Sequence, residues 1–133
     1  MDIKEYTNYN EDEILALYND AGWVAYTQDK DALRRGYENS LIKLGAYEGD
    51  KLIGIIRAVG DGATIVFVQD IIVLKEHQRE GVGTKLLKEV LDRFSNVRQI
   101  ELVTDNTPKT IAFYKSVGFR PLDEIGCAGF MKF

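Results

Sequence analysis

Apolar residues recur at helical spacing in two segments of the first third of the chain. Residues 11–20, EDEILALYND, place most of their apolar side chains on one helical face. Residues 29–41 repeat an apolar residue every fourth position as far as Leu41, with acidic residues near the start, where the helix dipole favours them. Residues 3–7 read as a short strand, and residues 21–27, AGWVAYT, interrupt the helical pattern. The pattern therefore predicts a strand followed by two helices.

The period of the apolar residues then changes from helical to strand-like. Residues 44–59 contain two apolar runs joined at residues 49–50, a Gly-Asp pair typical of a two-residue hairpin turn. Residues 63–74 form a long apolar run of the kind that is buried on both faces of a sheet. The polar pair Gln69-Asp70 interrupts this run in its middle. Three consecutive strands are predicted, the last with an anomaly at that pair.

The second half of the chain returns to helical spacing twice. Residues 86–94 carry a helical apolar stripe, and residues 98–104 follow as a strand. Residues 107–117 begin with a Thr-Pro pair and are followed by a glycine, which are the usual boundary signals of a helix. The tail, residues 119–133, is best interpreted as two closing strands around a turn.

This order of elements, β-α-α-β-β-β-α-β-α-β-β, predicts an α/β fold in which about four helices pack on a mixed sheet. At 133 residues the chain has the length of one domain, which we place at residues 1–133. Edge strands expected at the C-terminal end of the chain could pair with a second copy, so a homodimer is a possible assembly.

Composition narrows the class of partner. The net charge of −4 argues against a nucleic-acid binder, because such domains usually carry a basic excess. The single cysteine, Cys127, has no partner for an internal disulfide, so we interpret it as a small buried residue of a protein in a reducing compartment. The single histidine, His77, makes a zinc site improbable. No signal peptide or membrane-spanning run is visible, so we expect a cytoplasmic protein without a membrane partner.

A glycine-containing segment, LKEHQREGVGTKLL at residues 74–87, joins the long strand to the next helix. Such a loop can bind anions, because the first N–H groups of a helix have no helical acceptor and glycines let a phosphate approach the backbone. The spacing fits neither a P-loop nor a dinucleotide-binding loop. It does fit Q-x-x-G-x-G at Gln78, Gly81 and Gly83. Taken alone, the segment is equally well explained as a tight turn without a ligand.

Two further features accompany this loop. The segment AFYKSVGF, residues 112–119, follows Asn106 on the next strand–helix unit, and a polar pair breaks the strand before the loop. In this order and on these elements, the three features resemble the GNAT superfamily of acetyl-CoA-dependent N-acetyltransferases, most strongly between Val68 and Phe119. The resemblance implies a central sheet splayed at a bulge near the polar pair. It also implies acetyl-CoA as co-substrate, with no metal.

The resemblance further implies which residues contact coenzyme A. The strand edge at Ile71 and Val73 would pair with the pantetheine arm through backbone groups. Backbone N–H groups at the helix start would hold the pyrophosphate. Asn106 matches a residue whose side chain contacts the cofactor, and capping the following helix is its alternative role. The expected cofactor-binding residues are Ile71, Ile72, Val73, Gln78, Arg79, Glu80, Gly81, Val82, Gly83, Thr84, Asn106 and Tyr114.

The catalytic candidates also follow from the resemblance. Tyr114 matches the family tyrosine that lies near the coenzyme A sulfur and acts as general acid, and packing beside Phe113 is its structural alternative. The positions where some relatives carry a base fall on Phe67 and Gln69, which cannot take a proton. Asp70 is the nearest ionisable group. It is either a base, acting directly or through water, or a hydrogen-bond acceptor that closes the bulge.

The acceptor is less well indicated. Trp23 and Tyr26 lie in the segment between the first two helices, which in this fold borders the acceptor cleft, and they could contact an amine or simply cover the core. The resemblance implies direct acetyl transfer to a primary amine, with a small molecule as the expected acceptor. The alternatives are a protein or peptide amine, or a non-catalytic acyl-CoA-binding sensor on the same fold.

Overall fold

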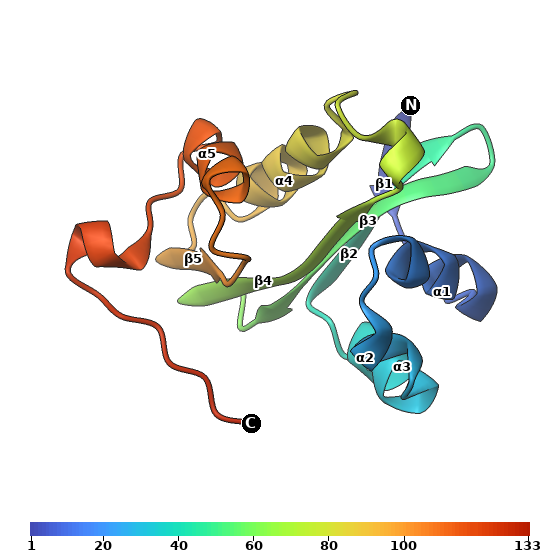
Figure 1. Ribbon diagram of the computed structural model, residues 1–133, viewed down its shortest axis with the longest axis horizontal. Coiled ribbons are helices and arrows are strands. Elements are labelled where there is room, and N and C mark those ends of the chain that lie inside the picture. The colour runs from blue at the N-terminus through green and yellow to red at the C-terminus, as the bar shows by residue number, and fades with distance from the viewer. The chain divides into compact units, whose positions relative to one another are not determined.

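The computed structural model describes every residue from Met1 to Phe133, and these residues divide into two compact units (Figure 1). Residues 1–102 form the sheet unit, and residues 103–133 form the C-terminal unit.

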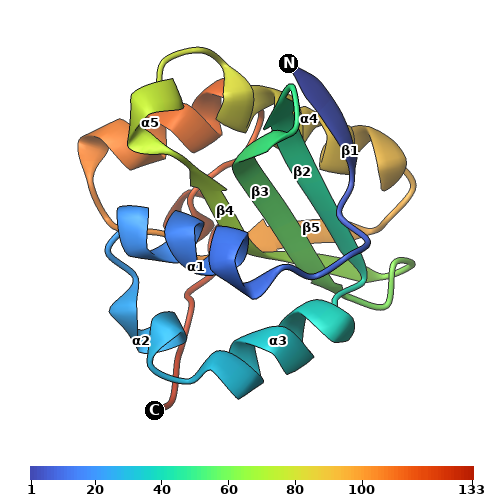
Figure 2. The same cartoon turned by 90° about the vertical axis from the view of Figure 1, so that its right-hand side faces the viewer.

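The sheet unit is built on one mixed five-stranded sheet, in the order β1-β2-β3-β4-β5 (Figure 2). Consecutive strands from β1 to β4 pair antiparallel, whereas β4 and β5 pair parallel. This is the mixed sheet that the element order predicts, including the hairpin turn at residues 49–50. The strands are β1 Asp2–Glu5, β2 Ile42–Glu48, β3 Lys51–Gly60, β4 Ile65–Val73 and β5 Gln99–Leu102.

Helices cover both faces of this sheet (Figure 2). Side chains from α1, α3, β3 and β4 share one apolar cluster with Tyr6, which follows β1, so α1 and α3 pack on one face. On the other face, a Cβ at Gly54 of β3 would lie 3.2 Å from Val82 Cγ1 and 3.3 Å from Leu86 Cδ1 of α4. The helices of this unit are α1 Glu11–Asp20, α2 Val24–Thr27, α3 Lys30–Glu38 and α4 Val82–Arg93, with a 3-10 turn at Lys75–His77.

A bulge interrupts the β3–β4 ladder at Gln69. Arg57 pairs with Asp70, but the next residue, Ala58, pairs with Val68, so Gln69 is an extra residue on β4. The bulge changes which face the side chains of β4 meet, because neighbours in a strand alternate between faces. Val68 and its partner Ala58 lie on the face of the sheet that α4 covers, whereas Asp70 lies on the face that α1 and α3 cover. The predicted anomaly at the polar pair is thus a bulge.

The N-terminal helices differ from expectation in two details. The helix predicted over residues 29–41 ends at Glu38, because Asn39 Nδ2 and Ser40 Oγ donate to carbonyls of its last turn, at 2.8 and 2.7 Å. Leu41 instead donates its N–H to Ala58 O at 2.8 Å, which extends the sheet. The irregular segment that precedes α3 contains α2, a single helical turn that the apolar pattern did not predict.

The C-terminal unit contains α5, Pro108–Ser116, and a 3-10 helix at Leu122–Ile125. Thr107 caps α5 by accepting a hydrogen bond from Thr110 N–H, as predicted. The two closing strands predicted over residues 119–133 are wrong, since this tail forms no strand. The 3-10 helix is followed by a hydrogen bond from Cys127 N–H to Leu122 O at 2.8 Å, so these backbone groups bond within the turn and not to a neighbouring strand. Cys127 is exposed, so its interpretation as a buried residue is wrong as well.

Candidate functional site

The glycine loop forms an anion cradle at the start of α4. Gly81 is the N-cap residue with φ 80°, a left-handed conformation that a side chain would strain. The first helical hydrogen bond runs from Lys85 N–H to Gly81 O at 3.1 Å. The preceding N–H groups of the first turn, those of residues 82–84, therefore have no helical acceptor. Their partial positive charge adds to the helix dipole, so this turn can bind phosphate oxygens.

Side chains of the loop have separate roles. Arg79 also adopts a left-handed conformation, with φ 71°, which is uncommon for a residue other than glycine and often marks a functional loop. Gln78 Nε2 donates to Val73 O at 3.2 Å and so ties the loop to the end of β4. Glu80 Oε1 lies 3.1 Å from His77 Nδ1, so the Glu80 side chain is held by a neighbour within the loop.

The last part of β4 offers an open backbone edge. The parallel ladder with β5 ends at the pair Val68–Leu102, immediately before the bulge. Leu74 N–H donates to Ile53 O at 2.9 Å, so even-numbered residues beyond the bulge direct their backbone groups to β3. By the same alternation, Ile71 and Val73 direct their backbone groups away from β3, where the Val73 carbonyl accepts from Gln78 Nε2.

Ile72 belongs to a different environment from its two neighbours. It pairs with Ile55 of β3, and only 3% of its surface is exposed in the apolar cluster below α1. The backbone of Ile72 therefore pairs with β3 and its side chain packs in the core, whereas Ile71 and Val73 lie on the unpaired edge of β4.

Asp70 lies in a buried network and not on an open cleft wall. Its Oδ2 accepts from Arg57 Nε at 2.6 Å and from the Tyr18 hydroxyl at 2.8 Å. The Tyr18 and Tyr37 hydroxyls are 2.8 Å apart. A Cβ at Gly36 of α3 would lie 3.1 Å from Arg57 Nη1, so this glycine leaves room for the guanidinium. Of the two roles considered for Asp70, base or hydrogen-bond acceptor at the bulge, this arrangement is consistent with the acceptor.

Protonation states in this network follow from burial and charge. Burial raises the pKa of Tyr18 and of Tyr37, so both phenols stay neutral and can donate. Burial alone would lower the pKa of Arg57, but the Asp70 carboxylate outweighs it and raises that pKa. Arg57 therefore remains charged. Sequence reasoning missed both Arg57 and Tyr18, although a lone arginine in the run LIGIIRAV was a usable signal.

Trp23 and Tyr26 form an aromatic surface beside the bulge. Trp23 is 38% exposed, and both rings contact Tyr18, with centroids 6.0 and 5.1 Å away. The extra residue of the bulge, Gln69, donates from Nε2 to the Tyr26 hydroxyl at 3.1 Å. Burial, followed by the charge of Asp70, raises the pKa of Tyr26. The two aromatic residues thus cover part of the core and also present an accessible face.

The C-terminal unit holds the two remaining candidates. Tyr114 is half-buried on α5, where its ring contacts Phe113 and Phe119 at centroid distances of 5.0 and 5.9 Å. Burial raises the pKa of its phenol, so Tyr114 keeps its proton at neutral pH. Asn106 is exposed and does not cap α5, because Thr107 does. The capping role considered for Asn106 is therefore wrong, and its side chain is free for another partner.

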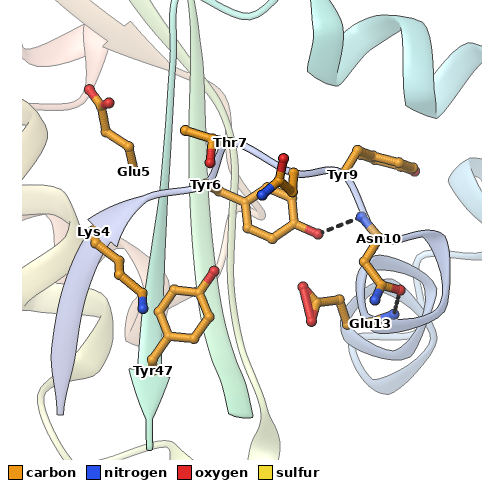
Figure 3. A pocket seen from close by; sticks show the side chains of 9 residues that line it. Lys4, Glu5, Tyr6, Thr7, Tyr9, Asn10, Glu13 and Tyr47 are labelled. Atoms are coloured by element: carbon orange, nitrogen blue, oxygen red, sulfur yellow. Dashed lines mark hydrogen bonds between the residues drawn. The ribbon is translucent and has the colours of Figure 1, made fainter. Parts of the chain in front are cut away.

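A cavity of about 540 Å³ lies between β1 and the start of α1 (Figure 3). Tyr6 and Tyr47 line it together with Glu13 of α1, and the Tyr6 hydroxyl accepts from Asn10 N–H at 2.9 Å. None of its lining residues belongs to the predicted site. No group of three or more His, Cys, Asp or Glu side chains is placed to hold a metal ion, and none of the helices has the length and apolar character to cross a membrane.

The model of the acetyltransferase (GNAT) family matches residues 5–119, which is most of the chain. This chain belongs to the GNAT family. The GNAT domain is 27% identical over 125 residues to the uncharacterized N-acetyltransferase ycf52 of Gracilaria tenuistipitata var. liui, covering 90% of this chain and 65% of the relative. A ycf52-like N-acetyltransferase of Prochlorococcus marinus is also 27% identical, covering 80% of this chain and 61% of the relative. The domain therefore spans less than two thirds of the length of these curated relatives.

Solved structures agree on the fold. A GNAT-family acetyltransferase from Streptococcus pneumoniae superimposes with a TM-score of 0.90 at 38% identity, covering 99% of this chain and 96% of that one. An aminoglycoside 6′-N-acetyltransferase complexed with coenzyme A superimposes with a TM-score of 0.71 at 18% identity, covering 89% of this chain and 84% of that one. The latter likeness shows the fold alone. The mixed sheet with helices on both faces is thus the GNAT fold.

Proposed function

We propose that this GNAT domain transfers an acetyl group from acetyl-CoA directly to a primary amine of a small molecule. The observation that carries the proposal is the continuity between two features of the sheet unit. The open edge of β4 at Ile71 and Val73 leads through the loop into the anion cradle at the start of α4. An extended arm that ends in phosphates is complementary to such an edge followed by such a cradle.

The residues of the sheet unit fit coenzyme A in chemical type. The backbone N–H and C=O of Ile71 and the N–H of Val73 would pair with the amide groups of the pantetheine arm, while the Val73 carbonyl is held by Gln78. The N–H groups of residues 82–84 would hold the pyrophosphate, and exposed Arg79 adds positive charge beside them. Asn106 of the C-terminal unit is proposed as a further side-chain contact to the cofactor.

Acetyl-CoA supplies the activated thioester. The amine nitrogen forms a bond to the carbonyl carbon, the carbon–sulfur bond breaks, and the departing sulfur needs a proton. We assign that proton to the Tyr114 hydroxyl, because Tyr114 matches the tyrosine of the family motif and a phenol, with an ordinary pKa of about 10, is protonated at neutral pH. The exposed Cys127 has no activating base near it in sequence, so attack without an acetyl-enzyme is the simpler route.

Two further roles complete the proposal. The acceptor amine would lie against Trp23 and Tyr26, whose ring faces attract a cation or an aromatic group. The proton that the amine loses would go to Asp70 or to water. Asp70 is the ionisable candidate on β4, but its Oδ2 already accepts two hydrogen bonds.

The experiment is a thiol-release assay with acetyl-CoA and a panel of small amines, peptides and lysine-containing proteins, with coenzyme A binding measured separately by calorimetry. Tyr114→Phe should lower kcat by tenfold or more while binding of coenzyme A is retained. Tyr47→Phe, which changes a tyrosine of the β1–α1 cavity, is the matched control. Turnover with peptides alone would replace the small-molecule acceptor. Binding without turnover of any amine would favour an acyl-CoA sensor, and absence of binding by folded protein would overturn the proposal.

A further inference from the structure

A buried ion pair lies beside the point where β4 opens. Arg57 and Asp70 face each other across the β3–β4 ladder, next to the extra residue Gln69. Their side chains are only 8% and 1% exposed. The hydroxyl of Tyr18, on α1, donates a hydrogen bond to Asp70. Isolated buried charges are strongly disfavoured, so each member of this pair requires the other in place.

The ion pair and the bulge depend on each other. Without the extra residue, the strand would slip by one position, and a slip of one position turns every later side chain to the opposite face. Asp70 would then leave Arg57 and enter the apolar face that β4 shares with α4, where Val82 and Leu86 lie. A carboxylate without a partner in such surroundings is costly. The pair therefore penalises the regular, unbulged register.

We propose that the Arg57–Asp70 pair, braced by Tyr18, is the positioning device that holds the bulge at Gln69 and so aims the backbone of Ile71 and Val73 at coenzyme A. Asp70 is then a positioning residue and not the general base. The proposal rests on the proposed function, because it assigns the pair to the use of acetyl-CoA.

The geometry around Asp70 supports positioning over proton transfer. Oδ2 is occupied by two donors, Arg57 Nε and the Tyr18 hydroxyl. The side chain is almost completely inaccessible, whereas a base must meet an incoming amine. Tyr37 adds a second layer, since Arg57 lies 5.1 Å from its ring centroid and its hydroxyl contacts that of Tyr18.

The test compares three variants. Asp70→Asn breaks the pair, Tyr18→Phe removes the brace but keeps the ring, and the double variant Arg57→Leu with Asp70→Leu removes both charges together. The double variant guards against loss of folding, because apolar replacement of a complete buried pair is commonly tolerated. Glu5→Gln, which breaks the exposed pair between Glu5 and Arg93 at 3.2 Å, is the control.

Positioning predicts that coenzyme A affinity falls at least tenfold in Asp70→Asn and in the folded double variant. It falls by two- to fivefold in Tyr18→Phe, and the shape of the pH–kcat profile stays that of wild type in every variant that turns over. A general base predicts the opposite. Coenzyme A affinity would be retained, kcat would fall, and Tyr18→Phe would move the acidic limb of the pH profile to higher pH.

Cross-strand contacts measured by NMR distinguish failure of the positioning proposal from failure of the proposed function. The bulged register places Ala58 opposite Val68 and Arg57 opposite Asp70. Loss of this register in the double variant supports the proposal, and its full retention with unchanged coenzyme A affinity overturns it. A wild-type protein that does not bind coenzyme A overturns the proposed function instead, and the register measurement still decides whether the pair holds the bulge.

Discussion

The side chain of Gln78 donates a hydrogen bond from Nε2 to the carbonyl oxygen of Val73, at 3.2 Å. This bond joins the loop of the anion cradle to the open edge of β4, so the two proposed contact regions for coenzyme A are held in one geometry. We therefore expect Gln78 to act by fixing the loop to β4 and not by contacting an anion with its side chain.

Gln78→Ala should weaken coenzyme A binding by about two- to tenfold, the loss expected for one hydrogen bond worth roughly 0.5–1.5 kcal/mol. Calorimetric titration with coenzyme A measures the effect. Gln99→Ala, an exposed glutamine on β5, should leave the affinity unchanged. Equal coenzyme A affinity in both variants would show that Gln78 does not contribute to the coenzyme A site.

Gly81→Ala should lower the free energy of unfolding by about 1–2 kcal/mol and weaken coenzyme A binding, because a left-handed conformation strains any residue with a Cβ. The surroundings are open, with no atom within 4 Å of the added Cβ, so the loss comes from backbone strain and not from a clash. Asn tolerates this conformation better, so Gly81→Asn should be closer to wild type in denaturant unfolding. An alanine variant as stable as the wild type would contradict this account.

Asp61 should make the fold sensitive to acid. Its carboxylate accepts from the N–H groups of Ala63, Thr64 and Ile65 at 2.9, 2.8 and 3.0 Å and from the Thr64 hydroxyl at 2.6 Å. These hydrogen bonds lower the pKa of Asp61 below its unfolded value, so its contribution to stability is present above that unfolded value and is lost as pH falls toward the folded one.

Asp61→Asn should therefore lower Tm at pH 7, and the difference from wild type should shrink as pH falls below about 4, the usual pKa of an aspartate. Thermal unfolding at a series of pH values measures this. Asp50→Asn in the β2–β3 turn is a control that changes the same charge. A difference in Tm that is constant from pH 7 to pH 3 would show that Asp61 has no such linkage.

Leu17→Ala should destabilise the sheet unit by about 2–5 kcal/mol, because this side chain is 1% exposed in the cluster between α1 and the sheet. Leu41→Ala should cost much less, since Leu41 is 39% exposed. Urea unfolding of both variants provides the comparison. Similar losses in the two would mean that the cluster around α1 is not the main core of the unit.

Local signals in the chain predicted most of the regular elements. Helix α1 occupies the predicted residues 11–20, and the Gly-Asp pair at residues 49–50 forms the hairpin turn. These features depend on neighbours within a few positions, through helical or alternating burial and through turn chemistry. Family motifs at Gln78, Gly81 and Gly83 then indicated the kind of ligand.

The tail shows where a local pattern fails. Apolar residues in residues 119–133 were consistent with strands, but a strand needs a partner that pairs with its backbone. Residues 122–125 bond within their own turn instead, and Phe130 is 96% exposed. Intrinsic preference for a strand is weak beside the presence or absence of such a partner.

By itself, the sequence determined the order of helices and strands up to α5 except for the single turn α2, the place of the bulge at Gln69-Asp70, and membership of the GNAT family. Only the tertiary structure decided which residues Asp70 contacts. Its partner Arg57 is thirteen positions away and its brace Tyr18 is fifty-two positions away. No local periodicity encodes such contacts, because they arise when β3, β4 and α1 pack and exclude water from the charges between them.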